Sequence, residues 1–306
     1  MKLRSNNITH WSRSLVEIRP EERVRAGAMF FYFFFTLSLI YILKPVRNAL
    51  FLGELGARNL RYVYMGEGLF LIFVVAAYIY LSKKIPRKIF FSGILFFFAS
   101  HLVTFWFLFQ WKVPYLSAIF YIWVSSFSIT TTTQFWILAN DIFNPHEAKR
   151  LFGLIISGGS AGGIIGGLAT NQAMKWLHAE DMLLIAAAVL VICAIGLFAF
   201  WGHIYPSKSE IHHAEKKISA RHSGSKMMLA SSYLMMLALL VMTAKMASTI
   251  IDNQFNAFVE LAITGKEART AFFGNFLAGL NAVSFFMQLI ATSFCLHFFG
   301  RRCRPD

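Results

Sequence analysis

The sequence predicts an all-α polytopic membrane protein with eight spanning helices. Of its 306 residues, 57% are hydrophobic and only 14% are charged, whereas average soluble domains carry about 25% charged residues. Several apolar runs also exceed the roughly 18 to 20 residues that an α-helix needs to cross a bilayer. Because both observations hold along most of the chain, they exclude a soluble globular domain and predict the lipid bilayer as the protein's surroundings.

The expected spans form two groups, which a polar segment separates. This segment contains Pro, Ser, Gly, His and charges of both signs, a composition typical of linkers. The expected spans are 26–52, 62–81, 89–109, 115–139, 151–173, 182–201, 227–251 and 270–299. The predicted division of the chain is a cytoplasmic amino-terminal segment 1–25, a six-helix half 26–203, a linker 204–226 and the start of a second half 227–306.

The second group of spans begins as the first group does. Lys245 lies in the seventh expected span as Lys44 lies in the first, and Arg47 is the one further Lys or Arg within any expected span. Six spans, a linker and a restart are typical of transporters that are built from two related halves. We therefore expect eight spans of a full set of twelve, and a chain that is part of a longer protein.

The basic residues predict the orientation of the chain in the membrane. The amino terminus, every second connector and the tail share one side and carry 20 Lys and Arg residues, against six on the opposite side. Since cytoplasmic loops are enriched in Lys and Arg, we expect a cytoplasmic amino terminus. The net charge of +14 follows from this asymmetry, so we expect no nucleic-acid partner.

The end of the first span carries two cations and an amide. Lys44, Arg47 and Asn48 share one helix face, because residues three and four apart are neighbours on a helix. A cation at membrane depth costs roughly 2.5 to 3.5 kcal/mol and marks a functional site by default. We interpret this face as a site for an anion such as phosphate or carboxylate. The alternative is that both cations reach the outer interface from the helix end.

Other polar side chains in the spans are candidates for the same site. Lys245 and Asp252 are seven residues apart, near one face of the seventh span, and Asn256 ends the polar run that follows. Asp252 marks either a substrate site or the outer end of the helix in water. Glu67, between two glycines of the second span, is a candidate ligand or, as we favour, the partner of Arg47 in an ion pair.

Amide side chains occupy polar faces of two further spans. Gln134 lies in the fourth span, and Asn281, Ser284 and Gln288 share a face of the eighth. Such faces either line an aqueous cavity or form interhelical hydrogen bonds. Because both spans carry such a polar face, we include Gln134 and Asn281 among the candidate binding residues.

The connector before the fifth span is a candidate cytoplasmic gate. Asn144, Pro145 and Glu147 predict a capped helix start. Glu147, Lys149 and Arg150 offer charge pairs that would hold one transport state. An ordinary capped turn is the alternative.

Glycines run along the fifth span in two interleaved ladders. Such ladders predict close packing of helix backbones, or a sliding surface. No strand precedes them and no Gly-Lys-Ser/Thr sequence follows, which excludes a phosphate-binding loop. The ladders are Gly158, Gly162 and Gly166, and Gly159, Gly163 and Gly167.

The sequence has no pattern typical of a catalytic or metal centre. No nucleophile accompanies a base, no span carries paired carboxylates, and the histidines lack regular ligand spacing. Cys193, Cys295 and Cys303 lack the spacing of a metal site or a disulfide framework. We therefore expect no enzymatic activity, no metal and no cofactor.

Three stretches carry a resemblance to known proteins. They are LKPVRNALFL in the first span, FWILANDIFNPHEAKRLFGLI at the end of the fourth, and more weakly IIDNQFNAF through AFFGNF. The sequence resembles the ATP/ADP translocase (NTP/NDP exchange) family of plastids and intracellular bacteria, and its bacterial relatives with the major facilitator fold. The resemblance implies a major-facilitator-like helical bundle that exchanges ATP for ADP by alternating access. It also implies that Lys44 and Arg47 contact phosphate groups and that Asp252 holds the acidic position of the seventh span.

Two positions depart from the pattern of that family. The fourth span has no acid before Asp141, and Asn256 stands where a basic residue is common. Two alternatives to a nucleotide antiporter follow. One is a major-facilitator-type transporter of another organic anion, and the other is a membrane sensor or scaffold that does not transport.

Overall fold

The computed structural model describes Arg19, residues 22–205 and residues 232–299, and of residues 149 and 289–299 the backbone alone. This part of the chain consists of eight long α-helices and two short 3-10 helices, without strands. In order they are α2 (Arg23–Glu54), η2 (Ala57–Asn59), α3 (Leu60–Lys84), α4 (Arg87–Gln110), α5 (Leu116–Ile142), α6 (Pro145–Ala173), η3 (Ala179–Asp181), α7 (Met182–Ile204), α10 (Ser232–Ala262) and α11 (Lys266–Phe299). Most of the predicted linker, residues 206–226, lies outside the described part.

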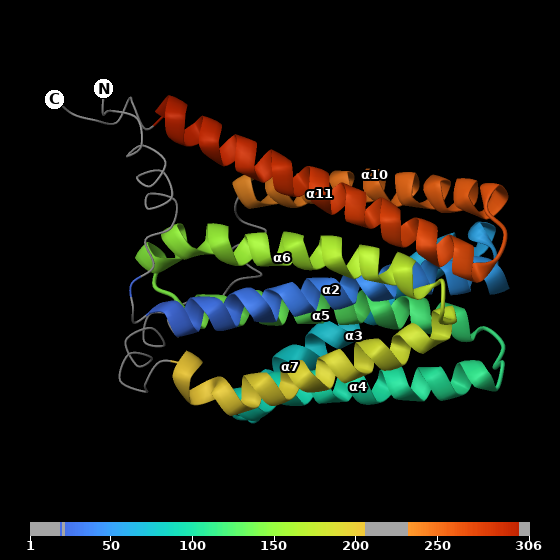
Figure 1. Ribbon diagram of the computed structural model, residues 1–306, viewed down its shortest axis with the longest axis horizontal. Helices are drawn as coiled ribbons and strands as arrows, with labels where there is room; N and C mark the ends of the chain where they lie inside the picture. The colour runs from blue at the N-terminus through green and yellow to red at the C-terminus, as the bar shows by residue number, and fades with distance from the viewer. Residues whose placement is uncertain (1–18, 20–21, 206–231, 300–306) are drawn as a thin grey trace, which may run out of the picture.

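The described helices lie side by side as one bundle (Figure 1). Seven of them are long and apolar enough to cross a membrane by length and composition. The eighth, α5, has 27 residues and carries several Ser and Thr side chains. Ser126, Ser128 and Thr131 satisfy their hydroxyls locally, since each donates to the carbonyl four residues earlier. The protein is therefore an all-α, integral multi-pass membrane protein, as predicted.

Helix α10 continues well beyond the expected end of its span. We expected this span to end at residue 251, whereas α10 runs to Ala262. The polar side chains after residue 251 do not end the helix, and one of them bonds within it: Asn256 Nδ2 donates to the Asp252 carbonyl at 2.7 Å. The interpretation of Asp252 as the outer end of the helix is therefore wrong.

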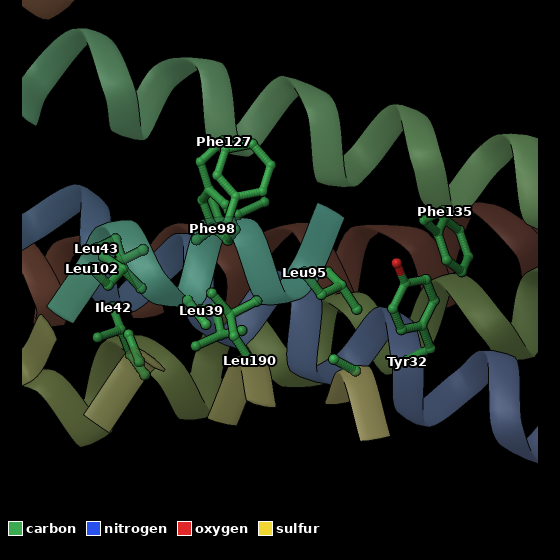
Figure 2. Packing of buried hydrophobic residues seen from close by; sticks show 14 of the residues in the cluster. Tyr32, Leu39, Ile42, Leu43, Leu95, Phe98, Leu102, Phe127, Phe135 and Leu190 are labelled. Atoms are coloured by element: carbon green, nitrogen blue, oxygen red, sulfur yellow. The ribbon is translucent and has the colours of Figure 1, made fainter. Parts of the chain in front are cut away.

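Helix α2 is the centre of the bundle and contacts α5, α6, α7 and α11. It continues as one helix through Pro45. In a bilayer, tight van der Waals packing replaces the exclusion of water as the force that holds helices together. Figure 2 shows part of this packing, in which α2, α4, α5 and α7 contribute Tyr32, Leu39, Ile42, Leu43, Leu95, Phe98, Leu102, Phe127, Phe135 and Leu190.

Helix α6 lies between α2 and α11, and its glycines allow both contacts. A methyl group at Gly166 would lie 2.5 Å from the carbonyl oxygen of Ser38 in α2. At Gly167 it would lie 2.5 Å from the carbonyl oxygen of Gly274 in α11. The predicted close packing along the glycine ladders is confirmed, and it attaches the second group of helices to the first.

Helices α3 and α10 are held mainly at one end. Leu60 and Val63 are the buried residues of α3, and Asn256 and Val259 are those of α10. Three of these four residues belong to one apolar cluster at the end of the bundle that is predicted to be the outer end. We call it the outer-end cluster: Phe51, Leu52, Ala57, Leu60, Val63, Tyr121, Val259 and Phe273.

Candidate functional site

The predicted cationic face of α2 turns toward α5. The Arg47 guanidinium lies over the Tyr121 ring, with 4.1 Å between Cζ and the ring centroid, and it donates to the Ser125 hydroxyl. Its Nε donates to Oδ1 of the buried Asn48 at 3.3 Å. These partners are all neutral, so they orient the guanidinium without cancelling its charge. Arg47 therefore binds side chains of the bundle and does not reach for the membrane interface.

Lys44 is half-buried, one turn before Arg47. Among the described residues no carboxylate lies within ion-pair distance of its ammonium group. Lys44 and Arg47 therefore form a face of α2 whose two cations both lack an ion-pair partner in the described part of the chain.

Two tyrosines connect the cationic face to α10. The Tyr64 hydroxyl of α3 donates to Asp252 Oδ2 at 3.0 Å. The Tyr64 ring packs edge-on against Tyr121, with 6.1 Å between ring centroids, and Tyr121 in turn lies under Arg47. Four helices therefore meet in the series Arg47, Tyr121, Tyr64 and Asp252.

Sequence reasoning missed both tyrosines. Tyr64 lies three residues before Glu67 and thus on its helix face, and this spacing was the available signal. It is a weak signal, because the chain has ten tyrosines and tyrosine is also enriched at membrane interfaces for unrelated reasons.

Glu67 does not form the expected ion pair with Arg47. Its carboxylate is half-buried and has no ion-pair partner among the described residues. Sequence spacing within one helix does not predict whether a side chain meets a partner on another helix. At Gly66 helix α3 lies close to α5, since an added methyl group would be 3.0 Å from Ile122 Cδ1.

The predicted residues of α10 lie in contrasting surroundings. Lys245 is exposed and forms no ion pair with Asp252, two turns further along. Asn256 is fully buried, and its Oδ1 has no hydrogen-bond partner in the described structure. Asn253 Oδ1 is also buried without a partner. Two unsatisfied amide oxygens near Asp252 are costly in a bundle.

Gln134 and Asn281 make contacts between helices elsewhere in the bundle. Gln134 is fully buried in α5, and its Nε2 donates to the Phe91 carbonyl of α4 at 2.7 Å. Asn281 Nδ2 donates to the Leu277 carbonyl, and its amide packs against Gly163 of α6. No described contact joins either residue to the cationic face.

The candidate gate residues bind the amino-terminal end of α2. Arg150 pairs with the buried Glu22 at 2.7 Å, and Glu147 pairs with Arg25 at 3.6 Å. Glu147 also completes the predicted capping box at the start of α6. The side chain of Lys149 lies outside the described part. These pairs fasten α6 to α2 within the first group of helices.

A further set of contacts joins the two groups of helices at the predicted outer end. Glu260 of α10 accepts from the Ala57 amide at 2.6 Å. Lys266, at the start of α11, pairs with Glu180 at 2.5 Å, and Glu267 lies 3.7 Å from His178. These residues lie far apart in the sequence, so no spacing predicts that they meet.

Comparison with known proteins places the chain in a family. The sequence profile of the TLC ATP/ADP transporter family matches residues 109–302. The chain belongs to this family. ADP,ATP carrier protein 1 of Chlamydia trachomatis is 25% identical and that of Chlamydia muridarum 24%, each over 192 residues. Each alignment covers 56% of this chain and 36% of the relative, so the chain spans well under half the length of these curated relatives. No solved structure shows a significant match.

The matched part of this TLC-family chain contains some of the candidate residues and not others. Residues 109–302 include Tyr121, Lys245 and Asp252 but not Lys44 or Arg47. The family match therefore says nothing about the cationic face of α2, and the support for a role of this face comes from its contacts in the structure.

Proposed function

We propose that this TLC-family protein exchanges ATP for ADP across a bacterial inner membrane, with its amino terminus in the cytoplasm. The observation that carries the proposal is the pair Lys44 and Arg47. Both cations belong to the central helix of the bundle, and neither has a carboxylate within ion-pair distance among the described residues. Family membership and the names of the two chlamydial relatives support nucleotides as the anions.

Phosphate oxygens would bind at the cationic face of α2. The donors of Arg47 now bond to Ser125, Tyr121 and Asn48. A phosphate can replace these neutral partners without separating an ion pair. Each charge-assisted hydrogen bond contributes roughly 1.5 to 3 kcal/mol, and the planar guanidinium suits two oxygens of one phosphate.

Alternating access would require the contacts at the predicted outer end to open. The outer-end cluster, the Glu260 contact with the Ala57 amide and the Lys266–Glu180 pair join the two groups of helices there. By contrast, the first half of α10, before Thr249, is exposed except at the half-buried Leu234. We infer that the described arrangement gives access to the site from the cytoplasmic side and that an outward-open state lacks these contacts.

The proposal is tested by exchange in proteoliposomes that contain the purified chain. Uptake of labelled ATP should require ADP inside the vesicles, and Lys44→Ala/Arg47→Ala should abolish it. The matched control is Arg58→Ala/Arg61→Ala, which removes two exposed basic residues near the η2 turn. Uptake that persists in the Lys44/Arg47 variant would refute the site. Uptake of another organic anion in place of ATP, or nucleotide binding without exchange, would refute nucleotide antiport.

A further inference from the structure

An apolar groove lies between α3 and α4, away from the cationic face. It has a volume of about 480 Å³, within the roughly 300 to 1,000 Å³ typical of ligand pockets. Side chains such as Phe70 and Val74 of α3 and Phe97 of α4 form its walls, and Trp123 of α5 contributes to its floor. The groove exists because the two consecutive helices pack on different neighbours: α3 packs mainly on α5, and α4 on α7.

The groove reaches the connector between α3 and α4, and the helix end before this connector is basic. The groove lining extends to Leu81, Ile85 and Ile89, and the last turn of α3 carries Lys83 and Lys84. The residues at this mouth therefore combine an apolar channel with cations at the end of the bundle that is predicted to be cytoplasmic.

Two cations beside the mouth have no counter-charge. Arg87 pairs with Asp141, whereas Lys83 and Lys84 have no carboxylate within ion-pair distance among the described residues. Both lysines are exposed, and the Lys84 ammonium lies 4.3 Å from the Tyr80 ring centroid. Lys88 is not part of this site, because its ammonium lies over the ring of Phe198 in α7, outside the groove lining. An anionic group at the mouth would meet the ammonium donors of Lys83 and Lys84.

We propose that the α3/α4 groove binds an anionic phospholipid, with one acyl chain in the groove and the headgroup phosphate on Lys83 and Lys84. The apolar walls match an acyl chain, and the uncompensated lysines select a negative headgroup over a zwitterionic one. Basic pockets between spanning helices at the cytoplasmic side are suited to such headgroups. The site is independent of the transported anion, so it does not rest on the proposed function.

Tryptophan quenching tests the proposal, because Trp123 lines the groove. The purified chain is titrated in mixed micelles with phosphatidylglycerol or phosphatidylcholine that carries bromine on an acyl chain. Bromine quenches tryptophan on contact, and the same titration of Trp123→Phe isolates the signal of Trp123. We expect half-maximal quenching of Trp123 at a several-fold lower mole fraction of phosphatidylglycerol than of phosphatidylcholine.

Two variants separate the headgroup from the acyl chain. Since a lysine near an anionic surface contributes a factor of about five in affinity, Lys83→Ala/Lys84→Ala should raise the half-maximal phosphatidylglycerol fraction roughly tenfold or more. Arg58→Ala/Arg61→Ala removes the same charge at the other end of α3 and should leave it unchanged. Gly93→Leu should reduce quenching by both lipids, because Gly93 lines the groove and faces open space, whereas Gly196→Leu on α7 should not.

Several results would overturn the proposal. Equal titration curves for the two lipids would show unselective lipid around the protein. An unchanged preference in Lys83→Ala/Lys84→Ala would remove the headgroup site. Quenching by neither lipid, together with self-association of the chain in the same micelles, would assign this face to a second copy of the protein.

Discussion

The contact between α2 and α6 gives a sharp prediction about stability. An alanine methyl at Gly162 would fall against the carbonyl oxygen of Phe34, so the two helices must separate. Overpacking of this kind costs about 1 to 3 kcal/mol, and separation also weakens the 2.9 Å hydrogen bond from Ser38 Oγ to the Gly162 carbonyl. The higher helix propensity of alanine offsets up to about 1 kcal/mol of this loss in the free energy of unfolding. We therefore expect Gly162→Ala to lower the free energy of unfolding by about 1 to 2 kcal/mol.

Two other glycines of α6 provide matched controls. A methyl group at Gly153 meets nothing within 4 Å, so Gly153→Ala should raise the free energy of unfolding by up to about 1 kcal/mol through propensity alone. At Gly163 a methyl group would meet Asn281 Oδ1 at 2.6 Å, the movable end of a side chain. The free energy of unfolding of Gly163→Ala should therefore lie between those of Gly162→Ala and Gly153→Ala. Unfolding in mixed micelles at increasing mole fractions of a denaturing detergent measures this order. Equal effects at Gly162 and Gly153 would refute the described packing.

Three further predictions concern the polar contacts. Tyr64→Phe removes the hydroxyl that donates to the α10 carboxylate and should cost roughly 0.6 kcal/mol of unfolding free energy; a cost above that of Gly162→Ala would contradict this limited role. Arg150→Ala leaves Glu22 buried without its partner and should lower the free energy of unfolding by about 2 kcal/mol. The double variant Arg150→Ala/Glu22→Gln should recover part of this loss, and no recovery would argue against the ion pair. Glu180→Cys/Lys266→Cys, joined by a short thiol cross-linker, should block ATP/ADP exchange until the link is cleaved, while exchange that continues would show that these helices need not separate.

Composition and periodicity were sufficient to predict the helices. Each expected span coincides with a helix in the described part. The bilayer thickness sets the length of a span, and its backbone N–H and C=O groups must form hydrogen bonds within the segment, which an α-helix provides. The glycine ladders of α6 also predicted close packing correctly, since a helix face without side chains permits it. Asp252 shows the limit of this reasoning, because the polar run after it is typical of a helix end, whereas α10 continues to Ala262 and Asn256 bonds within it.

The relations between helices were harder to predict. Glu67 was expected to pair with Arg47 and does not, because the sequence does not fix how α3 is rotated against α2. Tyr121 and Tyr64 were missed for the same reason, as they become neighbours of Arg47 and Asp252 only when four helices meet. Lys44 and Arg47 could be singled out from the sequence because a cation in a span is conspicuous by itself. Their role as an anion site stays a prediction.

Equilibrium binding of ATP to the purified chain tests the central claim most directly. The claim is that Lys44 and Arg47 hold phosphate groups, and each lost charge-assisted hydrogen bond should cost roughly 1.5 to 3 kcal/mol, about 10- to 150-fold in Kd. Titration calorimetry should therefore show that Lys44→Ala/Arg47→Ala loses measurable ATP binding while Arg58→Ala/Arg61→Ala keeps the wild-type Kd. An unchanged Kd in the Lys44/Arg47 variant, with the fold intact by circular dichroism, would contradict the account.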